Sequence, residues 1–291
     1  MVKRSPARYA NGLREIATTH HEVSRHTHPS PADSVNRPPY RVCPTPMRLI
    51  RVYTAGSLAA GARLTLSARA SNHLSTVLRL QRGATLQVFN GQGQEHAATL
   101  LQPHHQHAEI LLSDALPTLP ESPLRITLAQ GISRGDRMDY AIQKATELGV
   151  TDIIPLLCER SVVRLDASQA ARKHEHWTGI AISAAEQSGR AHVPHISLAQ
   201  RYADYAGKAL PDARCRLVLD PSATAGPSAL APAGRPIDLL IGPEGGLTAQ
   251  EISIAKLGEF SALKLGPRVL RTETAAAAAM TALQTLYGDL G

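Results

Sequence analysis

The 291-residue sequence is poor in cysteine, in large aromatic side chains and in long apolar runs, and each shortage excludes a class of protein. Its three cysteines, at positions 43, 158 and 215, form no CxxC pair, which excludes a disulfide framework or a zinc ribbon and fits a reducing cytoplasm. No window approaches the roughly 20 apolar residues of a membrane span. One tryptophan and two phenylalanines argue against base stacking on aromatic rings as the main mode of nucleic-acid binding.

The sequence also lacks the short motifs of several enzyme classes. It contains no GxGxxG or Walker A loop and no HExxH. The histidines at 104, 105 and 107 fall on an expected hairpin, and those at 174 and 176 face different directions of an expected helix. We therefore expect no metal site, and the missing GxGxxG argues against a nucleotide-binding oxidoreductase.

Positive charge is what the sequence has in excess, and it is concentrated near the N-terminus. The net charge is +7. Residues 1–46 hold seven basic and three acidic residues, residues 47–118 hold six and three, and residues 119–291 hold eighteen of each. If a polyanion binds, the front of the chain is expected to supply the non-specific attraction.

The first 46 residues differ in composition from the rest. They contain seven of the 20 prolines and only six Val, Leu, Ile or Phe side chains. Because so little apolar surface is available to offset the entropy of ordering, we expect this segment to be disordered. The alternative is an upstream extension from a start codon called too early, in which case Met47 is the natural start. The segment lacks the apolar core of a signal peptide.

Residues 47–118 are expected to form a small β-rich domain. Thr85 to Asn90 alternates with a period of two and runs into an Asn-Gly-Gln-Gly turn, as in a β-hairpin. Two further strands are expected at 97–101 and 108–112, and a helix at 68–79. The proline-rich stretch from Leu116 to Pro123 reads as a linker.

Residues 119–291 alternate strand and helix, which predicts a mostly parallel sheet covered on both faces. The expected strands begin at Leu124 and span 153–157, 216–219, 237–241 and 262–265. The expected helices span 136–148, 170–188, 248–258 and 272–287. Thr248 and Glu251 have capping-box spacing at the start of the third of these helices.

Two Gly-Pro loops join strand to helix in this second half and predict one binding pocket. Ile241-Gly-Pro-Glu-Gly-Gly246 follows one apolar strand, and Leu265-Gly-Pro-Arg-Val-Leu-Arg-Thr-Glu-Thr274 follows another. Glycine lets backbone approach a ligand closely, and open α/β sheets bind ligands beyond the carboxyl ends of their strands. Arg271 and Glu273 stand at the N-terminus of the final helix, where a cation is unfavourable unless it has a function. A plain loop and helix capping remain the alternatives for these residues.

Five segments in order resemble the RsmE family, the 16S ribosomal RNA uridine-N3 methyltransferases. They are Arg134-Gly-Asp-Arg-Met-Asp-Tyr-Ala-Ile-Gln-Lys-Ala-Thr-Glu-Leu-Gly149, Ser161-Val-Val-Arg-Leu165, Ala184-Ala-Glu-Gln-Ser-Gly-Arg190, GPEGG at 242–246 and LGPRVLRTETA at 265–275. Met47 to Tyr53, with Asn72-His73 and Val77-Leu-Arg79, resembles the opening domain of that family. At position 134 the family's usual lysine is an arginine.

The resemblance implies a knotted SPOUT methyltransferase domain over 119–291, with a C-terminal trefoil knot, after a PUA-like RNA-binding domain over 47–118. It implies S-adenosylmethionine as cofactor, 16S rRNA of the assembled small ribosomal subunit as substrate, and a homodimer in the cytoplasm. The residues expected around the cofactor are Gly242, Glu244, Gly245, Leu265, Gly266, Val269 and Leu270. The residues expected to contact RNA are Arg48, Arg51, His73, Arg79 and Arg190.

The chemistry implied for uridine N3 requires loss of a proton and stabilisation of charge on O2 and O4. Arg271 is the first candidate for the second task, and Glu273 is expected to orient it or to accept the proton; His73 is a weaker candidate. Glu186 and Arg190 lie one helical turn apart and are expected to pair. The alternatives are a SPOUT enzyme acting on another RNA atom, such as a ribose 2′-oxygen, and a non-catalytic RNA-binding assembly factor.

Overall fold

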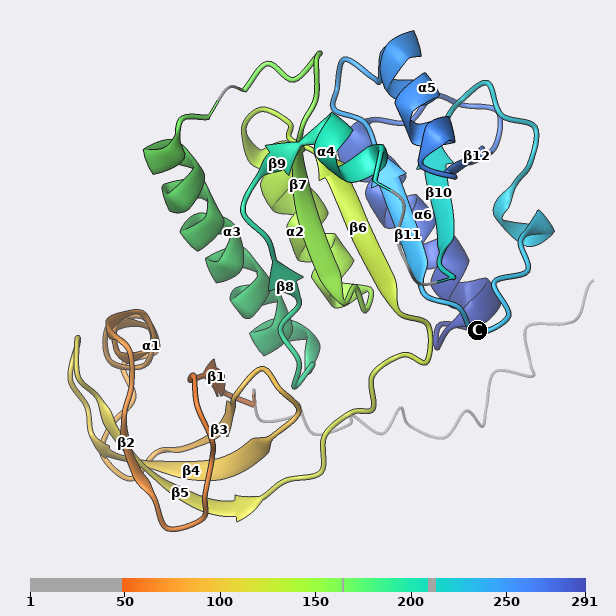
Figure 1. Cartoon of the computed structure of the whole chain (residues 1–291). Coiled ribbons are helices and arrows are strands. Elements are labelled where there is room, and N and C mark those ends of the chain that lie inside the picture. Colours follow the sequence, from red (N-terminus) through yellow and green to blue (C-terminus); the bar gives the residue numbers. More distant parts are fainter. Residues whose placement is uncertain (1–48, 164, 209–212) are drawn as a thin grey trace, which may run out of the picture. The chain divides into compact units, whose positions relative to one another are not determined.

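The computed structural model describes residues 49–163, 165–208 and 213–291. Two sheets account for its strands, one built from residues 51–115 and the other from residues 126–263 (Figure 1). The disorder expected for residues 1–46, and Arg48, lie outside the described residues. Among the helices of the described segments, none combines the length and the apolar character that a membrane crossing requires.

The first sheet has the strand order β1-β3-β4-β5-β2 in the described residues. Its strands are β1 (Arg51–Tyr53), β2 (Arg63–Thr65), β3 (Thr85–Phe89), β4 (Glu95–Gln102) and β5 (Glu109–Ala115). Only the β1–β3 pairing is parallel. The expected hairpin joins β3 to β4, and the Asn90 side chain accepts hydrogen bonds from the backbone N–H groups of Gln92 and Gln94. The two expected strands at 97–101 and 108–112 correspond to β4 and β5.

The helix expected at 68–79 is shorter and ends in a different form. Helix α1 spans Ala68–Asn72, capped by the Ser67 side chain, and continues as a π-helical turn over His73–Val77. The buried residue of that turn is Leu74, which packs on the apolar face of the first sheet. The π-helical turn leaves His73 and Val77 exposed.

The second sheet is parallel throughout, in the order β12-β10-β11-β6-β7-β8, with β9 also pairing with β7. Its strands are β6 (Ile126–Gly131), β7 (Asp152–Leu157), β8 (His195–Ile196), β9 (Gln200–Arg201), β10 (Cys215–Leu219), β11 (Ile237–Ile241) and β12 (Ser261–Leu263). The mostly parallel sheet that the alternation predicts is confirmed. The two short strands β8 and β9 carry no apolar run and were not expected.

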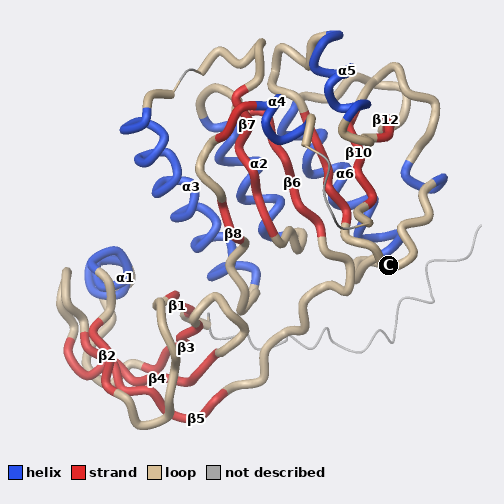
Figure 2. The backbone as a smooth tube through the Cα atoms, viewed as in Figure 1, coloured by secondary structure: helices blue, strands red, loops and turns tan. Residues whose placement is uncertain are grey.

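Helices cover both faces of this sheet, as Figure 2 shows. They are α2 (Asp136–Glu147), α3 (Ala167–Ser188), α4 (Tyr202–Ala206), α5 (Ala249–Leu257), α6 (Thr272–Tyr287) and a 3₁₀ turn at Pro227–Ala229. Along β11, Ile237, Leu239 and Ile241 join the apolar cluster of α2, α3 and α6, whereas Leu240 joins that of α4 and α5. Neighbouring strand residues therefore serve opposite faces, which explains the continuous apolar runs.

Two helix starts carry the side chains that the backbone requires. The Thr248 hydroxyl accepts from the Glu251 backbone N–H at 3.2 Å, and the Glu251 carboxylate accepts from the Thr248 N–H at 2.8 Å. This capping box confirms the spacing argument. A second box, made by Asp166 and Gln169, starts α3 three residues before the helix was expected. Hydrogen bonds that the Asp166 carboxylate accepts from Gln169 and Ser168 hold its pKa below its usual value.

Candidate functional site

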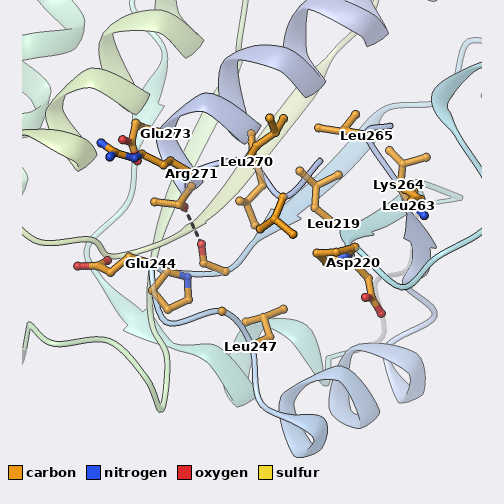
Figure 3. A pocket seen from close by; sticks show the side chains of 18 of the residues that line it. Leu219, Asp220, Glu244, Leu247, Leu263, Lys264, Leu265, Leu270, Arg271 and Glu273 are labelled. Atoms are coloured by element: carbon orange, nitrogen blue, oxygen red, sulfur yellow. Dashed lines mark hydrogen bonds between the residues drawn. The ribbon is translucent and has the colours of Figure 1, made fainter. Parts of the chain in front are cut away.

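A pocket of about 580 Å³ lies at the carboxyl ends of three adjacent strands, β11, β10 and β12 (Figure 3). Its walls come from the two Gly-Pro loops, from residues 219–221 at the carboxyl end of β10 and from the start of α6. The two loops were expected to share one pocket. The strand order brings them together, because β11 and β12 run parallel with only β10 between them, so both loops leave the same edge of the sheet. The position is the one at which open parallel sheets bind ligands.

The pocket combines an apolar wall with three carboxylates and four cations. Its apolar side chains are Leu219, Ile241, Leu247, Ile252, Leu263, Leu265, Val269 and Leu270. Asp220, Glu244 and Glu273 are its carboxylates, and Arg137, Lys264, Arg268 and Arg271 are its cations. Such a lining suits a ligand that has a flat apolar ring together with hydroxyl or ammonium donors.

The first loop approaches the pocket through Gly242, Glu244 and Gly246 rather than through Gly245. A Cβ atom on Gly242 would lie 2.9 Å from the Leu247 side chain, so the loop folds tightly on itself. A Cβ atom on Gly245 would instead lie 3.0 Å from the Cβ of Arg160. Gly245 therefore faces the segment after β7, and Gly246, at φ +69°, takes the place in the lining that we expected of Gly245.

The Glu244 carboxylate ties the first loop to the segment after β6. It accepts a hydrogen bond from the Arg134 backbone N–H at 3.1 Å and lies 3.6 Å from Nη1 of Arg137. Partial burial acts to raise the pKa of Glu244, but hydrogen bonds from backbone N–H groups and Ser133, with the charge of Arg137, lower it overall. The carboxylate stays ionised at neutral pH, and the Arg134 side chain is not needed for this contact because the backbone makes it.

The second loop forms the opposite wall. Gly266 is at φ +72°, a conformation that favours glycine, and open space surrounds the place where a side chain would begin. Leu265 and Leu270 are half-buried, whereas Val269 is 81% exposed at the margin of the pocket. All four residues line the cavity.

Arg271 and Glu273 reach the same pocket from the first turn of α6 (Figure 3). Arg271 is the N-cap residue, is exposed, and has no ion-pair partner among the described residues. The Glu273 side chain is half-buried, and its Oε2 atom is buried without a hydrogen-bond partner in that part of the chain. An unpaired buried carboxylate oxygen is costly, so a ligand donor is the natural partner for Glu273.

Two of the residues expected to contact RNA are exposed in the first domain. His73 lies in the π-helical turn, and Arg79, at φ +52°, follows it. Neither makes an ion pair within the described chain. Both remain available to a phosphate.

The expectation that Arg51 contacts RNA is contradicted by its burial. Its side chain is 6% exposed and pairs with Glu95 through two hydrogen bonds of 2.9 and 2.8 Å. Nη1 also donates to the Ala185 carbonyl at the end of α3, at 2.8 Å. These bonds use the guanidinium to attach β1 to α3, so it is not free for a phosphate.

Arg190 is likewise a buried structural residue rather than an RNA contact. Its guanidinium pairs with Glu121 and donates to the backbone carbonyls of Thr146 and Val150. The expected pairing with Glu186 is wrong, because Glu186 accepts the backbone N–H of Tyr53 at 3.0 Å instead. Glycine at position 189, in the left-handed conformation, ends α3 between the two side chains and turns Arg190 away from Glu186.

Sequence reasoning missed several pocket residues. Leu219 ends β10 and Asp220 follows it, and because no glycine-rich loop comes directly after this strand, neither residue carried a local signal. Arg137 was visible in the motif at 134–149 but had no expected role. Within the described ranges no group of His, Cys, Asp or Glu side chains is arranged to hold a metal ion.

The fold and the pocket together define the class of protein. A sequence model of the RNA methyltransferase domain matches residues 120–284, which contain the whole parallel sheet and both loops. The class is thus an RNA methyltransferase.

The particular family follows from individual relatives. A ribosomal RNA small subunit methyltransferase E of Buchnera aphidicola is 35% identical over 243 residues, covering 84% of this chain and 98% of that relative. That of Bacillus subtilis is 33% identical over 236 residues, covering 75% and 90% of the two chains. The chain belongs to the ribosomal RNA small subunit methyltransferase E family, RsmE.

Solved structures agree. The enzyme of that name from Neisseria gonorrhoeae, bound to S-adenosyl methionine, is 39% identical with a TM-score of 0.77, covering 84% of this chain and all of that one. A methyltransferase from Legionella pneumophila, in complex with the cofactor SAM, is 38% identical with a TM-score of 0.79 and the same coverage.

Proposed function

We propose that this chain transfers the methyl group of S-adenosylmethionine (SAM) to N3 of a uridine in 16S rRNA of the small ribosomal subunit. The observation that carries the proposal is the single pocket formed by both Gly-Pro loops at the carboxyl ends of β11, β10 and β12. Its relatives of known structure bind SAM, and its curated relatives act on small-subunit rRNA according to their names.

The residues of the pocket fit SAM. The leucine-rich wall offers an apolar surface for adenine, and the unpaired Oε2 of Glu273 offers an acceptor for a hydroxyl or ammonium donor. Gly242, Glu244, Leu265, Gly266, Val269 and Leu270 are the residues we assign to the cofactor, with Gly246 in the place of Gly245. Bound SAM supplies an electrophilic methyl group on its sulfonium.

The protein's own task is to prepare the uridine. N3 must lose its proton before it forms a bond to carbon, and negative charge then develops on O2 and O4. Arg271 carries a guanidinium at the pocket without an internal partner in the described chain, so we assign it to that charge. Glu273 is assigned to the N3 proton or to the orientation of Arg271, because its buried oxygen is unpaired beside it.

RNA contacts are assigned to exposed basic side chains only. His73 and Arg79 serve the first domain, Arg137 and Arg268 line the pocket, and exposed Arg134 lies next to it through its backbone bond to Glu244. Hydrogen-bond donors on these side chains supply phosphate contacts, which position RNA without reading its sequence. Arg51 and Arg190 are left out of this assignment because both guanidinium groups are buried in ion pairs.

The finer architecture is part of the proposal. We assign a PUA-like fold to the first sheet and a C-terminal trefoil knot to the second domain. Both assignments rest on the family to which the chain belongs. Tyr287, at the end of α6, donates from its hydroxyl to the carbonyls of Pro227 and Leu230, which holds the β10–β11 connection against α6. We also propose a cytoplasmic homodimer, for which exposed Val269 and Leu286 supply apolar surface.

The test combines cofactor binding with identification of the product. Calorimetric titration of the full chain with SAM is expected to give saturable binding. Small subunits that lack the modification, incubated with enzyme and SAM, are expected to gain one methyl group at uridine N3 by nucleoside mass spectrometry. Methylation of a ribose 2′-oxygen would replace the proposed atom, and RNA binding without SAM binding would identify a non-catalytic assembly factor.

A further inference from the structure

A buried chain of hydrogen bonds runs beneath the pocket and joins three elements. Gln130, at the end of β6, is 1% exposed, and its Nε2 donates to Oγ1 of Thr272 at 2.8 Å. Thr272, the first residue of α6, donates from the same hydroxyl to the Gly242 carbonyl at 2.7 Å (dashed line in Figure 3). The chain thus connects β6, α6 and the first Gly-Pro loop.

The Gly242-Pro243 peptide is held from a second side by backbone contact. A Cβ atom on Gly131, the residue after Gln130, would lie 2.5 Å from the Pro243 nitrogen and 2.8 Å from the Gly242 carbonyl carbon. Proline has no N–H with which to anchor itself. The Thr272 hydroxyl therefore provides a hydrogen bond to the carbonyl of this peptide, while the Gly131 backbone at the end of β6 packs against it.

Stability alone does not account for glutamine at position 130. Its Oε1 atom is buried and has no hydrogen-bond partner among the described residues, and the Nε2 group otherwise reaches only the neighbouring Gly131 carbonyl, at 3.2 Å. An unsatisfied buried acceptor destabilises the fold, whereas an apolar side chain of similar size avoids that penalty. What the glutamine contributes in return for this penalty is the hydrogen bond from its Nε2 group to the Thr272 hydroxyl.

We propose that Gln130 and Thr272 are positioning residues for methyl transfer. Their hydrogen bonds fix the first Gly-Pro loop relative to the first turn of α6. Arg271 and Glu273 flank Thr272 in the sequence, so the bond that holds Thr272 also sets the backbone from which both side chains leave. The inference rests on the proposed function, since it assigns the two residues to the SAM pocket and to the groups around the uridine.

The experiment uses the full chain with Thr272→Val, which keeps the side-chain shape and removes the hydroxyl, and Thr272→Ser, which keeps the hydroxyl. Thr146→Val is the matched control, because Thr146 is also buried and donates to a backbone carbonyl, that of Ile142 in α2, away from the pocket. Binding of SAM, kcat, KM for RNA, and hydrogen–deuterium exchange of the 240–248 segment are measured at a temperature at which every variant is folded.

Thr272→Val is expected to weaken SAM binding about tenfold, the usual consequence of leaving a buried hydrogen-bonding group unpaired. It is also expected to lower kcat and to speed exchange of the 240–248 segment, while KM for RNA stays near that of the wild type. Thr272→Ser is expected to keep SAM binding, kcat and exchange of the 240–248 segment near those of the wild type. Gln130→Met is expected to weaken SAM binding as well, and the effect of the double variant Gln130→Met, Thr272→Val is expected to fall short of the sum of the single effects.

Three results would overturn the inference. These are unchanged SAM binding and exchange in Thr272→Val, an equal loss in Thr146→Val, or additive effects of the two substitutions. Failure of the wild-type chain to bind SAM is a separate outcome that refutes the proposed function. In that case the exchange measurement still decides whether the two side chains hold the loop.

Discussion

Arg51 and Glu95 form a two-point ion pair in which each side chain is only 6% exposed. The pair lies between the first sheet and α3, because Arg51 also donates to the Ala185 and Arg190 carbonyls. Removing one partner leaves the other charge buried without compensation, which costs about 3–5 kcal/mol. An arginine that the charge distribution assigned to RNA is thus part of the folded core.

Arg51→Ala is therefore expected to lower the free energy of unfolding by about 3 kcal/mol or more, measured by urea denaturation. Arg79→Ala is the matched variant, since Arg79 is exposed and unpaired in the described chain. It is expected to leave stability nearly unchanged, to weaken RNA binding, and to reduce the salt dependence of binding by about one counterion. If Arg51→Ala instead weakened RNA binding without lowering stability, Arg51 would be an RNA contact.

Gly266→Ala is expected to weaken SAM binding. At φ +72° the new side chain costs about 1–2 kcal/mol of strain, which the second loop relieves by moving the pocket wall. Gly234→Ala is the control, because Gly234 has φ +76° and equally open surroundings but does not line the pocket. Both variants are expected to lose similar stability in thermal unfolding, and only Gly266→Ala to bind SAM more weakly in calorimetry. Equal SAM affinity in both would remove Gly266 from the cofactor site.

Arg271→Ala is expected to lower kcat about 100- to 1,000-fold at saturating SAM and RNA, the usual loss when a group that stabilises developing charge is removed. SAM binding is expected to persist, since the leucine wall and both loops remain. Arg125→Ala is a suitable control, because Arg125 is exposed just before the amino end of β6, at the opposite end of the sheet from the pocket. Turnover of Arg271→Ala near that of the wild type would exclude the proposed role.

Cys158 is expected to resist alkylation in the folded protein between pH 7 and pH 9. Burial, with a smaller contribution from the negative charge of Glu251, raises the pKa of its thiol to about 12. The thiolate is the reactive form, so a raised pKa leaves little of it at these pH values. Peptide mass spectrometry after iodoacetamide treatment is expected to find Cys158 modified only in urea. Alkylation of Cys158 that increases with pH between 7 and 9 in the native protein would contradict the burial and raised pKa of its thiol.

Sequence periodicity was sufficient for most of the second domain because the determinants are local. Apolar runs predicted β7, β10 and β11 within a residue or two, and the Thr248–Glu251 capping box marked the start of α5. Such signals depend on neighbours a few residues away, which the chain order itself supplies. The motifs at 242–246 and 265–275 likewise identified the loops that form the pocket.

Three features depended on contacts between distant parts of the chain. The short strands β8 and β9 exist because they pair with β7, and β1 because it pairs with β3. Gly246 lines the pocket and Gly245 does not, because Gly245 packs on Arg160. Asp220 enters the site only because β10 lies between β11 and β12.

The sequence by itself determined the kinds of elements, the two loops and the family, since each is encoded in spacing along the chain. The tertiary structure decided which charges are exposed. Arg51, Arg79 and Arg190 look alike in the sequence, yet two are buried beside carboxylates and one faces solvent. The partner that distinguishes them is 44 residues from Arg51 and 69 from Arg190. Only folding brings such partners together, because ion pairing is set by distance in space rather than along the chain.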